Sequence, residues 1–340
     1  MKSSKYLTSL VGFALLLATL SCKPNPAGKS GAEHPASQGS PAIEALTEKI
    51  KQAPNDASLY AARGAMWYEN QNFDEGIADL EQAIKLDSSK AEYFHGLADM
   101  YMDYYKSRLA VNVMERAAAK FPKRIPTLLK LAEFQLIVKM HNEALFSLER
   151  IRAIDPLNAE MFFSFGNVFK DMGKTDQALN AYQSAVENDP DLIDAWINLA
   201  NLLMDKNSPL VGKYLDNALR VDSNNIEALH AKAYFLSNKK NDLKGAVQLY
   251  KKINTINPQY DDGYYNAGLL YLDMDSLDQA YQSFDLAIKF NPTFAEAFYH
   301  RGVAAEMKGN LQQALSDYQN VLNLDPNFEA AKASVKRLKK

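Results

Sequence analysis

Six prolines recur at a fixed interval and constrain the fold of this chain more than any other feature. They stand at Pro122, Pro156, Pro190, Pro258, Pro292 and Pro326, at steps of 34 residues, with 68 residues between the two groups. A fixed period of this length indicates an array of similar structural units rather than one ordinary core. Because proline stops a helix, each unit is expected to end at a helix terminus.

Other positions keep the same period. In the first half of each unit a large apolar residue is followed four positions later by a small one, and spacings of three, four and seven residues are helical. Each unit therefore predicts two antiparallel helices, with small residues where the backbones approach closely. The pairs are Tyr60 and Gly64, Phe94 and Ala98, Leu128 and Ala132, Phe162 and Gly166, Trp196 and Ala200, Leu229 and Ala233, Tyr264 and Gly268, and Phe298 and Gly302.

This pattern resembles the tetratricopeptide repeat. The resemblance implies an all-α fold, a right-handed superhelical solenoid of tetratricopeptide helix pairs. The fifth unit is one residue short and the sixth is one residue long, and both slips are expected between helices. The eight units, here called unit one to unit eight, are 57–90, 91–124, 125–158, 159–192, 193–225, 226–260, 261–294 and 295–328.

The flanks of the array fit the same scheme. Residues 42–56 resemble the second helix of a repeat and predict a half-repeat helix, and residues 329–340 predict a polar capping helix. The basic end of the chain could touch anionic lipid, although positive charges near a helix C-terminus also complement the helix dipole. The resemblance thus spans 42–340 and leaves no room for a separate catalytic domain.

The beginning of the chain has the layout of a secretory signal. Lys2 and Lys5 precede an apolar run over 10–20, about half of the roughly 20 residues that a spanning helix needs. Residues 1–21 therefore predict a lipoprotein-type signal peptide, because Cys22, the sole cysteine, follows in a context that resembles the lipobox of bacterial lipoproteins. Thr19 departs from that motif, which usually has Leu there. The alternative is an ordinary signal peptide that leaves a free thiol.

Residues 22–41 predict a lipid-anchored flexible tether. The segment is rich in Pro, Gly, Ser and Ala and has almost no apolar residues, so it cannot bury enough surface to become ordered. A plain disordered terminus is the alternative.

Composition and motifs argue against several classes of function. Without Lys2 and Lys5, 36 basic residues face 41 acidic ones, which does not fit a nucleic-acid-binding surface. No catalytic motif is present within the repeats, so we expect no enzymatic activity, no cofactor and no small-molecule substrate. A metal site is not expected, because the five histidines are scattered without i, i+4 partners: His34, His95, His141, His230 and His300.

In the family, positions 2, 5, 6, 9, 12 and 13 of each unit line a concave groove. The resemblance therefore implies that acidic residues there select basic side chains, asparagines bind peptide backbone and aromatic residues hold apolar side chains. The alternative is that they are ordinary helix and repeat residues. The candidates are Glu160, Phe163, Asn167, Asp194, Asn198, Asn201, Tyr265, Asn266 and Tyr299.

Unit three departs from the pattern. Leu129, Leu136 and Ile137 occupy groove positions where polar residues are expected, and Gln135 takes a slot usually filled by an aromatic residue. These residues predict an apolar docking patch, unless they pack against a neighbouring helix. Family members that grip a free C-terminal carboxylate use basic groove residues, and Lys130 and Lys170 stand alone here, so we do not expect such a clamp.

Together these features predict a non-catalytic scaffold that binds protein or peptide partners in its groove. The lipid anchor would attach it to the bacterial outer membrane, on the periplasmic face, because Lys23 follows the cysteine where signals for other destinations tend to be acidic. There it would assist assembly or secretion of an envelope complex. The alternative is a chaperone-like carrier that holds unfolded or secreted clients transiently.

Overall fold

The structure, a computed structural model, describes residues 40–206 and 208–339. The predicted signal peptide, Cys22 and nearly all of the predicted tether lie outside the described residues. The described part consists of helices and short connections and contains no strand. The helices are α1 (Pro41–Gln52), α2 (Ala57–Glu69), α3 (Phe73–Leu86), α4 (Ala91–Asp103), α5 (Ser107–Lys120), α6 (Ile125–Ile137), α7 (His141–Arg152), α8 (Ala159–Asp171), α9 (Thr175–Asn188), α10 (Ile193–Met204), α11 (Leu210–Val221), α12 (Ile226–Lys240), α13 (Leu243–Ile256), α14 (Asp261–Asp273), α15 (Leu277–Phe290), α16 (Ala295–Met307), α17 (Leu311–Leu324) and α18 (Glu329–Leu338).

Each unit contributes two helices, so α2 to α17 form eight pairs between the flanking helices α1 and α18. Within most pairs the turn between the helices contains one residue with positive φ. Glycine takes this conformation at Gly173 (φ 72°) and Gly309 (φ 81°), whereas Gln71 and Lys139 adopt it with a side chain. The predicted all-α solenoid of helix pairs is confirmed.

Small residues allow the two helices of a pair to pack closely. A methyl group added at Gly166 on α8 would lie 2.4 Å from the ring of Tyr182 on α9, and one at Gly268 would lie 2.6 Å from the ring of Phe284. Both rings are fully buried. The small residue of each of these two pairs therefore lies against a large ring on the second helix of its unit, which lets the two helices pack closely.

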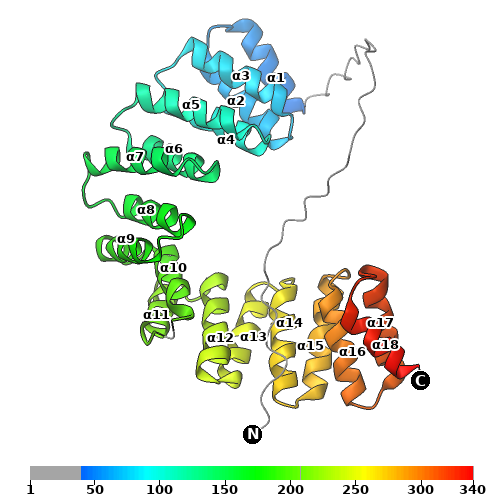
Figure 1. Cartoon of the computed structure of the whole chain (residues 1–340). Helices are drawn as coiled ribbons and strands as arrows, with labels where there is room; N and C mark the ends of the chain where they lie inside the picture. The colour runs from blue at the N-terminus through cyan, green and yellow to red at the C-terminus, as the bar shows by residue number, and fades with distance from the viewer. Residues whose placement is uncertain (1–39, 207, 340) are drawn as a thin grey trace, which may run out of the picture.

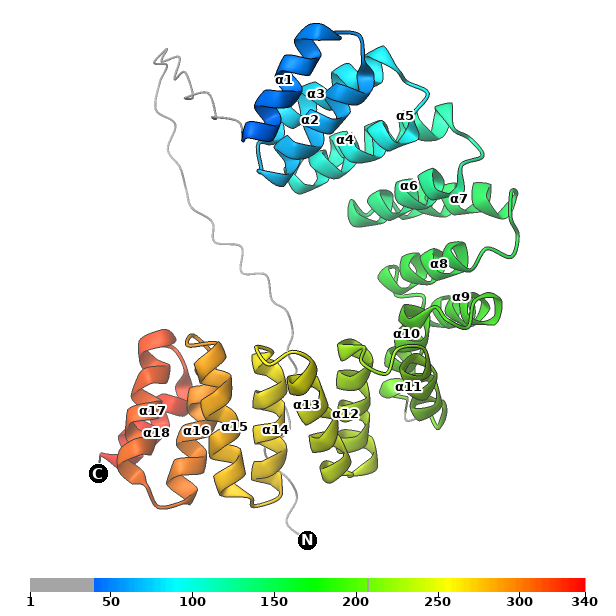
Figure 2. The same cartoon turned by 180° about the vertical axis from the view of Figure 1, so that it is seen from behind.

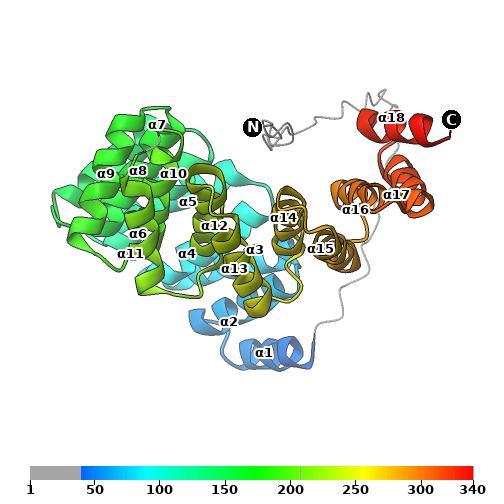
Figure 3. The same ribbon diagram turned by 90° about the horizontal axis from the view of Figure 1, so that it is seen from below.

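The pairs follow one another along a curved path, and the ends of the helical array lie far apart (Figures 1 and 2). The view from below shows that the path also leaves the plane, as in a superhelix (Figure 3). In units three to five the first helices α6, α8 and α10 lie toward the inside of the arc and the second helices α7, α9 and α11 lie toward the outside. The first helices therefore form a concave wall.

Buried ion pairs fix the first helix of the two outermost units. In unit one, Arg63 on α2 donates to Asp79 on α3 at 2.7 Å through both Nε and Nη2. In unit eight, Arg301 on α16 donates to the fully buried Asp317 on α17 at 3.1 Å and 2.6 Å. In both units the ion pair joins the arginine at position 7 of the unit to the aspartate at position 23.

Candidate partner-binding wall

A hollow of about 390 Å³ lies in the concave wall between the first helices of units five and six. It is bounded by α10 on one side and α12 on the other. All of its lining residues occupy positions 2, 5, 6, 9, 12 or 13 of their units. They are Asn201, Met204, Asp205, Glu227, His230, Ala231 and Tyr234.

The hollow is lined by polar and aromatic side chains. The ring of His230 lies against the buried ring of Tyr250 with a centroid separation of 5.5 Å, and this burial lowers the pKa of the His230 imidazole. A histidine with a lowered pKa is neutral at neutral pH. Tyr234 is 43 % exposed beside it. The hollow therefore offers a neutral histidine, an exposed tyrosine ring and the carboxylates of Asp205 and Glu227.

A row of acidic side chains runs along the same wall at position 2 of units four to eight. Within residues 40–206 and 208–339, none of these carboxylates forms an ion pair. Glu92 of unit two differs, because Arg124 binds its carboxylate at 2.8 Å. The row of unpaired carboxylates gives this wall an excess of negative charge. Its members are Glu160, Asp194, Glu227, Asp262 and Glu296.

Desolvation affects part of this row. It raises the pKa of the Asp262 carboxyl, and the neighbouring charge of Asp261 raises it further. Burial also raises the pKa of Asp273 at the other end of α14. Both effects mean that the fold destabilises the charged form of these carboxylates, so a cation brought to them would restore favourable interactions.

The predicted asparagines of the groove mostly bind other residues of the chain. Asn167 accepts a hydrogen bond from the hydroxyl of Tyr182 at 2.7 Å. Asn198 accepts one from Lys170 Nζ at 2.7 Å and donates to the carbonyl of Asp194 at 2.8 Å. Asn266 donates to the carbonyl of Asp262 at 2.8 Å. Asn201 differs, because it is exposed and lines the hollow.

The predicted aromatic residues of the groove are half-buried and pack against their neighbours. Phe163 lies 5.7 Å from the ring of Tyr182. Tyr265 packs against Phe294 at 4.7 Å, and Tyr299 packs against Phe328 at 5.2 Å. Glu160 and Asp194, by contrast, are exposed on the wall.

The apolar residues of unit three do not share one environment. Leu129 and Leu136 are half-buried and pack against the core that runs through units one to four, whereas Ile137 is 52 % exposed. Gln135 is buried and accepts a hydrogen bond from Ser147 Oγ at 2.8 Å. The predicted patch is therefore only partly exposed on this wall.

The basic groove residues are also engaged within the chain. Lys130 pairs with Asp99 at 2.6 Å, and Lys170 donates to Asn198. Among the described residues no cluster of His, Cys, Asp and Glu could hold a metal ion. In the same part of the chain, no helix combines the length and the apolar character needed to cross a membrane.

Two residues of the concave wall were not predicted from the sequence. His230 and Tyr234 were not among the candidate residues, although both stand at groove positions. Applying the position rule to unit six regardless of residue type would have found them.

Three family models match parts of the chain. A model described as TPR repeat matches residues 166–207, and two models described as tetratricopeptide repeat match 261–294 and 295–328. The last two ranges are the same as units seven and eight.

Curated proteins with similar sequences include three from Homo sapiens. Protein O-mannosyl-transferase TMTC3 is 24% identical over 243 residues, which are 68% of this chain and 26% of that protein. TMTC1 is 21% identical over 49% of this chain and 19% of its own length. Tetratricopeptide repeat protein 6 is 23% identical over 69% of this chain and 39% of its own length. The chain thus spans from about a fifth to two fifths of the length of these relatives.

Two solved structures share the fold. The C-terminal part of a TPR repeat-containing protein from Cytophaga hutchinsonii superimposes with a TM-score of 0.57 at 16% identity, over 72% of this chain and 99% of that one. A chain of the APC/C hetero-tetramer Cut9–Hcn1 gives a TM-score of 0.52 at 16% identity, over 88% of this chain and 59% of that one. Proteins of this repeat class bind protein or peptide partners, and their fold is typically a non-catalytic scaffold. With its eight helix pairs and its matching repeats, this chain is a member of the tetratricopeptide repeat family.

Proposed function

We propose that this chain is a non-catalytic scaffold that binds an extended, basic segment of a partner protein along its concave wall. The observation that carries the proposal is the row of five carboxylates on units four to eight that form no ion pair with any described residue. Unpaired charges of one sign steer and orient a partner of the opposite sign. The hollow between α10 and α12 supplies a place for one side chain of that segment, with carboxylates at its rim.

The polar and aromatic neighbours of the row fit an extended peptide. Asn201 is exposed beside Glu227 and can exchange hydrogen bonds with a peptide backbone. The rings of His230 and Tyr234 suit the aliphatic stem of Lys or Arg, whose charged end would reach the carboxylates of Asp205 and Glu227. The partner segment is therefore expected to carry basic residues spaced along its length.

The proposal includes a lipid anchor at Cys22 that holds the scaffold at the periplasmic face of a bacterial outer membrane. There it would assist assembly or secretion of an envelope complex. The signal-like residues 1–21 and the lipobox-like context of Cys22 support this part. Labelling with radioactive palmitate tests it, because wild type should carry label and Cys22→Ala should not. An unlabelled wild type would refute the anchor.

In-cell photocross-linking tests the scaffold itself. A photoreactive residue in place of Asn201 lies in the hollow, and the same residue in place of Glu187, exposed on the outward helix α9, is the matched control. We expect Asn201 to capture one recurring partner in stoichiometric amounts and Glu187 to capture none of it. A broad set of unfolded proteins at Asn201 would support a chaperone-like carrier instead, and equal capture at both sites would refute binding on the wall.

A further inference from the structure

A second surface lies on the outer face of the array, around α7 of unit three. A cleft of about 440 Å³ opens between the second helices α5 and α7, with Leu131 and Gln135 of α6 at its base. Phe146 stands on its α7 side and is 68 % exposed. This cleft is separate from the concave wall, because the second helices form it.

Comparison of the residues at position 22 of the eight units shows that the repeat does not require an aromatic side chain such as Phe146 there. In the other seven units this position is small or polar, and only unit three places a large apolar side chain there. An aromatic ring left mostly in water is unfavourable, and burial of such a side chain is what stabilises protein contacts. The residues at position 22 of the other seven units are Ala78, Asn112, Asn180, Lys213, Gln248, Gln282 and Ser316.

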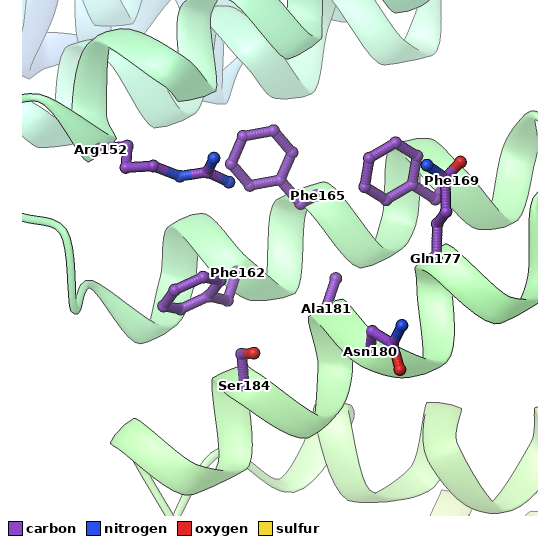
Figure 4. A pocket seen from close by; sticks show the side chains of 8 residues that line it. All are labelled: Arg152, Phe162, Phe165, Phe169, Gln177, Asn180, Ala181 and Ser184. Atoms are coloured by element: carbon purple, nitrogen blue, oxygen red, sulfur yellow. The ribbon is translucent and has the colours of Figure 1, made fainter.

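The size of the cleft has an identifiable cause. The equivalent cleft one unit later, between α7 and α9, has a volume of about 250 Å³, and the rings of Phe165 and Phe169 fill its base side by side (Figure 4). Unit three has Gln135 at the position of Phe169, and its amide is held by Ser147. The cleft beside Phe146 thus lacks an aromatic ring that its neighbour contains.

The charges on α7 indicate what covers this surface. Glu143 and Arg150 flank Phe146 on the same face of the helix. Neither forms an ion pair within the described part of the chain, and Arg150 donates one hydrogen bond to the carbonyl of Ala118 on α5 at 3.0 Å. They lie almost equally far from Phe146, three and four residues away along the helix. When two copies of α7 lie antiparallel with Phe146 at the centre, Glu143 of each copy therefore faces Arg150 of the other.

We propose that the chain forms a two-fold symmetric dimer through this outer face. Each α7 lies antiparallel to its counterpart, and Phe146 of each copy enters the cleft between α5 and α7 of the other. The ring that unit three lacks is supplied by the second copy, and two Glu143–Arg150 pairs close the contact. The interface is isologous, so it stops at two copies. It leaves the concave wall of each copy free.

Sedimentation velocity of the full chain over a concentration series, with every variant in the same detergent, tests the dimer. Wild type should sediment as a dimer, and Phe146→Asp should weaken self-association at least about a hundredfold, because two buried rings are lost per dimer. Leu157→Asp is the matched control, since Leu157 is 67 % exposed in the same unit but lies outside α7. This variant should remain dimeric. Circular dichroism verifies that all variants retain their helices.

Charge exchange tests the antiparallel register. Glu143→Arg and Arg150→Glu should each weaken the dimer on the order of tenfold, and the variant with both changes should regain wild-type association because the pairs form with reversed polarity. A monomeric wild type would overturn the proposal. This holds even if the monomer binds a different protein through Phe146. A dimer that survives Phe146→Asp, or a double variant no better than the single ones, would also overturn it.

Discussion

Replacement of Arg301 by Met isolates the contribution of the buried ion pair in unit eight. The carboxylate of Asp317 is fully buried and accepts hydrogen bonds from Arg301 Nε at 3.1 Å and Nη2 at 2.6 Å. Its only other hydrogen-bond donor among the described side chains is Gln313 Nε2 at 3.1 Å. Arg301 also reaches back to Asp285 on α15 at 2.5 Å. The variant therefore leaves a buried carboxylate with one neutral donor.

The expected cost follows from that environment. Loss of one partner from a buried ion pair costs about 3–5 kcal/mol, and the remaining Gln313 contact favours the lower end, about 3 kcal/mol. In a repeat array each unit contacts only its neighbours, so the loss should appear as local opening of α16 to α18 rather than as unfolding of the whole chain.

Hydrogen exchange read by mass spectrometry measures this opening. In Arg301→Met, amides of α16 to α18 should exchange roughly 150-fold faster, which corresponds to about 3 kcal/mol. Amides of α8 and α9 should keep their wild-type rates. The control is Arg301→Met with Asp317→Leu, which removes both charges and should restore protection to within about tenfold of wild type. The reasoning is refuted if the single variant exchanges less than about fivefold faster, or if the double variant is equally unprotected.

Three further changes test other parts of the fold. Gly166→Ala should destabilise by about 1–3 kcal/mol in urea unfolding, because the new methyl overlaps the buried ring of Tyr182; an unchanged midpoint would contradict the close contact. Ser147→Ala should cost about 1–3 kcal/mol in the same assay, since Gln135 loses its buried donor, and a neutral result would mean that water replaces it. Asp262→Asn should be more stable than wild type at pH 7, because the fold raises the pKa of this carboxyl. That advantage should disappear as the pH falls through the raised pKa toward about 3.9, and a pH-independent difference would count against it.

The helix pairs could be predicted from the sequence because their cause is local and periodic. Each proline slot follows the end of a helix, and where position 8 of a unit is glycine it lies against a large residue at position 24, on the second helix of the same unit. Gly166 and Tyr182 illustrate this contact. The large and small residues recur in all eight units, so the spacing predicts the helix pairs, and the resemblance to the repeat family implies the solenoid.

The state of individual groove residues could not be predicted in this way. Whether Tyr265 and Tyr299 face a ligand or their neighbours depends on packing between units, and the period does not specify it. In the structure Tyr265 packs on Phe294 at the end of its own unit and on His300 of the next unit. Asn198 likewise bonds Lys170 of the preceding unit. The prediction was better for the acidic residues Glu160 and Asp194, which are exposed. No basic side chain of the described residues lies close enough to form an ion pair with them.

The exposed ring on the outer face was not predicted from the sequence either. The apolar residues of unit three predicted a patch on the concave wall, yet Leu129 and Leu136 pack inward while Phe146 stands exposed on the opposite side. A comparison of position 22 across the units would have singled out Phe146. The signal was present, but it concerned the second helix rather than the groove.

Fluorescence anisotropy with a labelled peptide in which lysine and leucine alternate tests the central claim about the concave wall. Wild type should bind this peptide, with affinity that falls as salt rises, and should bind the glutamate counterpart far more weakly. Glu160→Lys with Asp194→Lys should weaken binding on the order of tenfold, since two favourable contacts become repulsive. The control, Glu75→Lys with Glu187→Lys, makes the same change of charge on the second helices α3 and α9 of their units and should bind as wild type does. Equal affinity for both peptides, or equal losses in both double variants with intact helicity, would contradict the account.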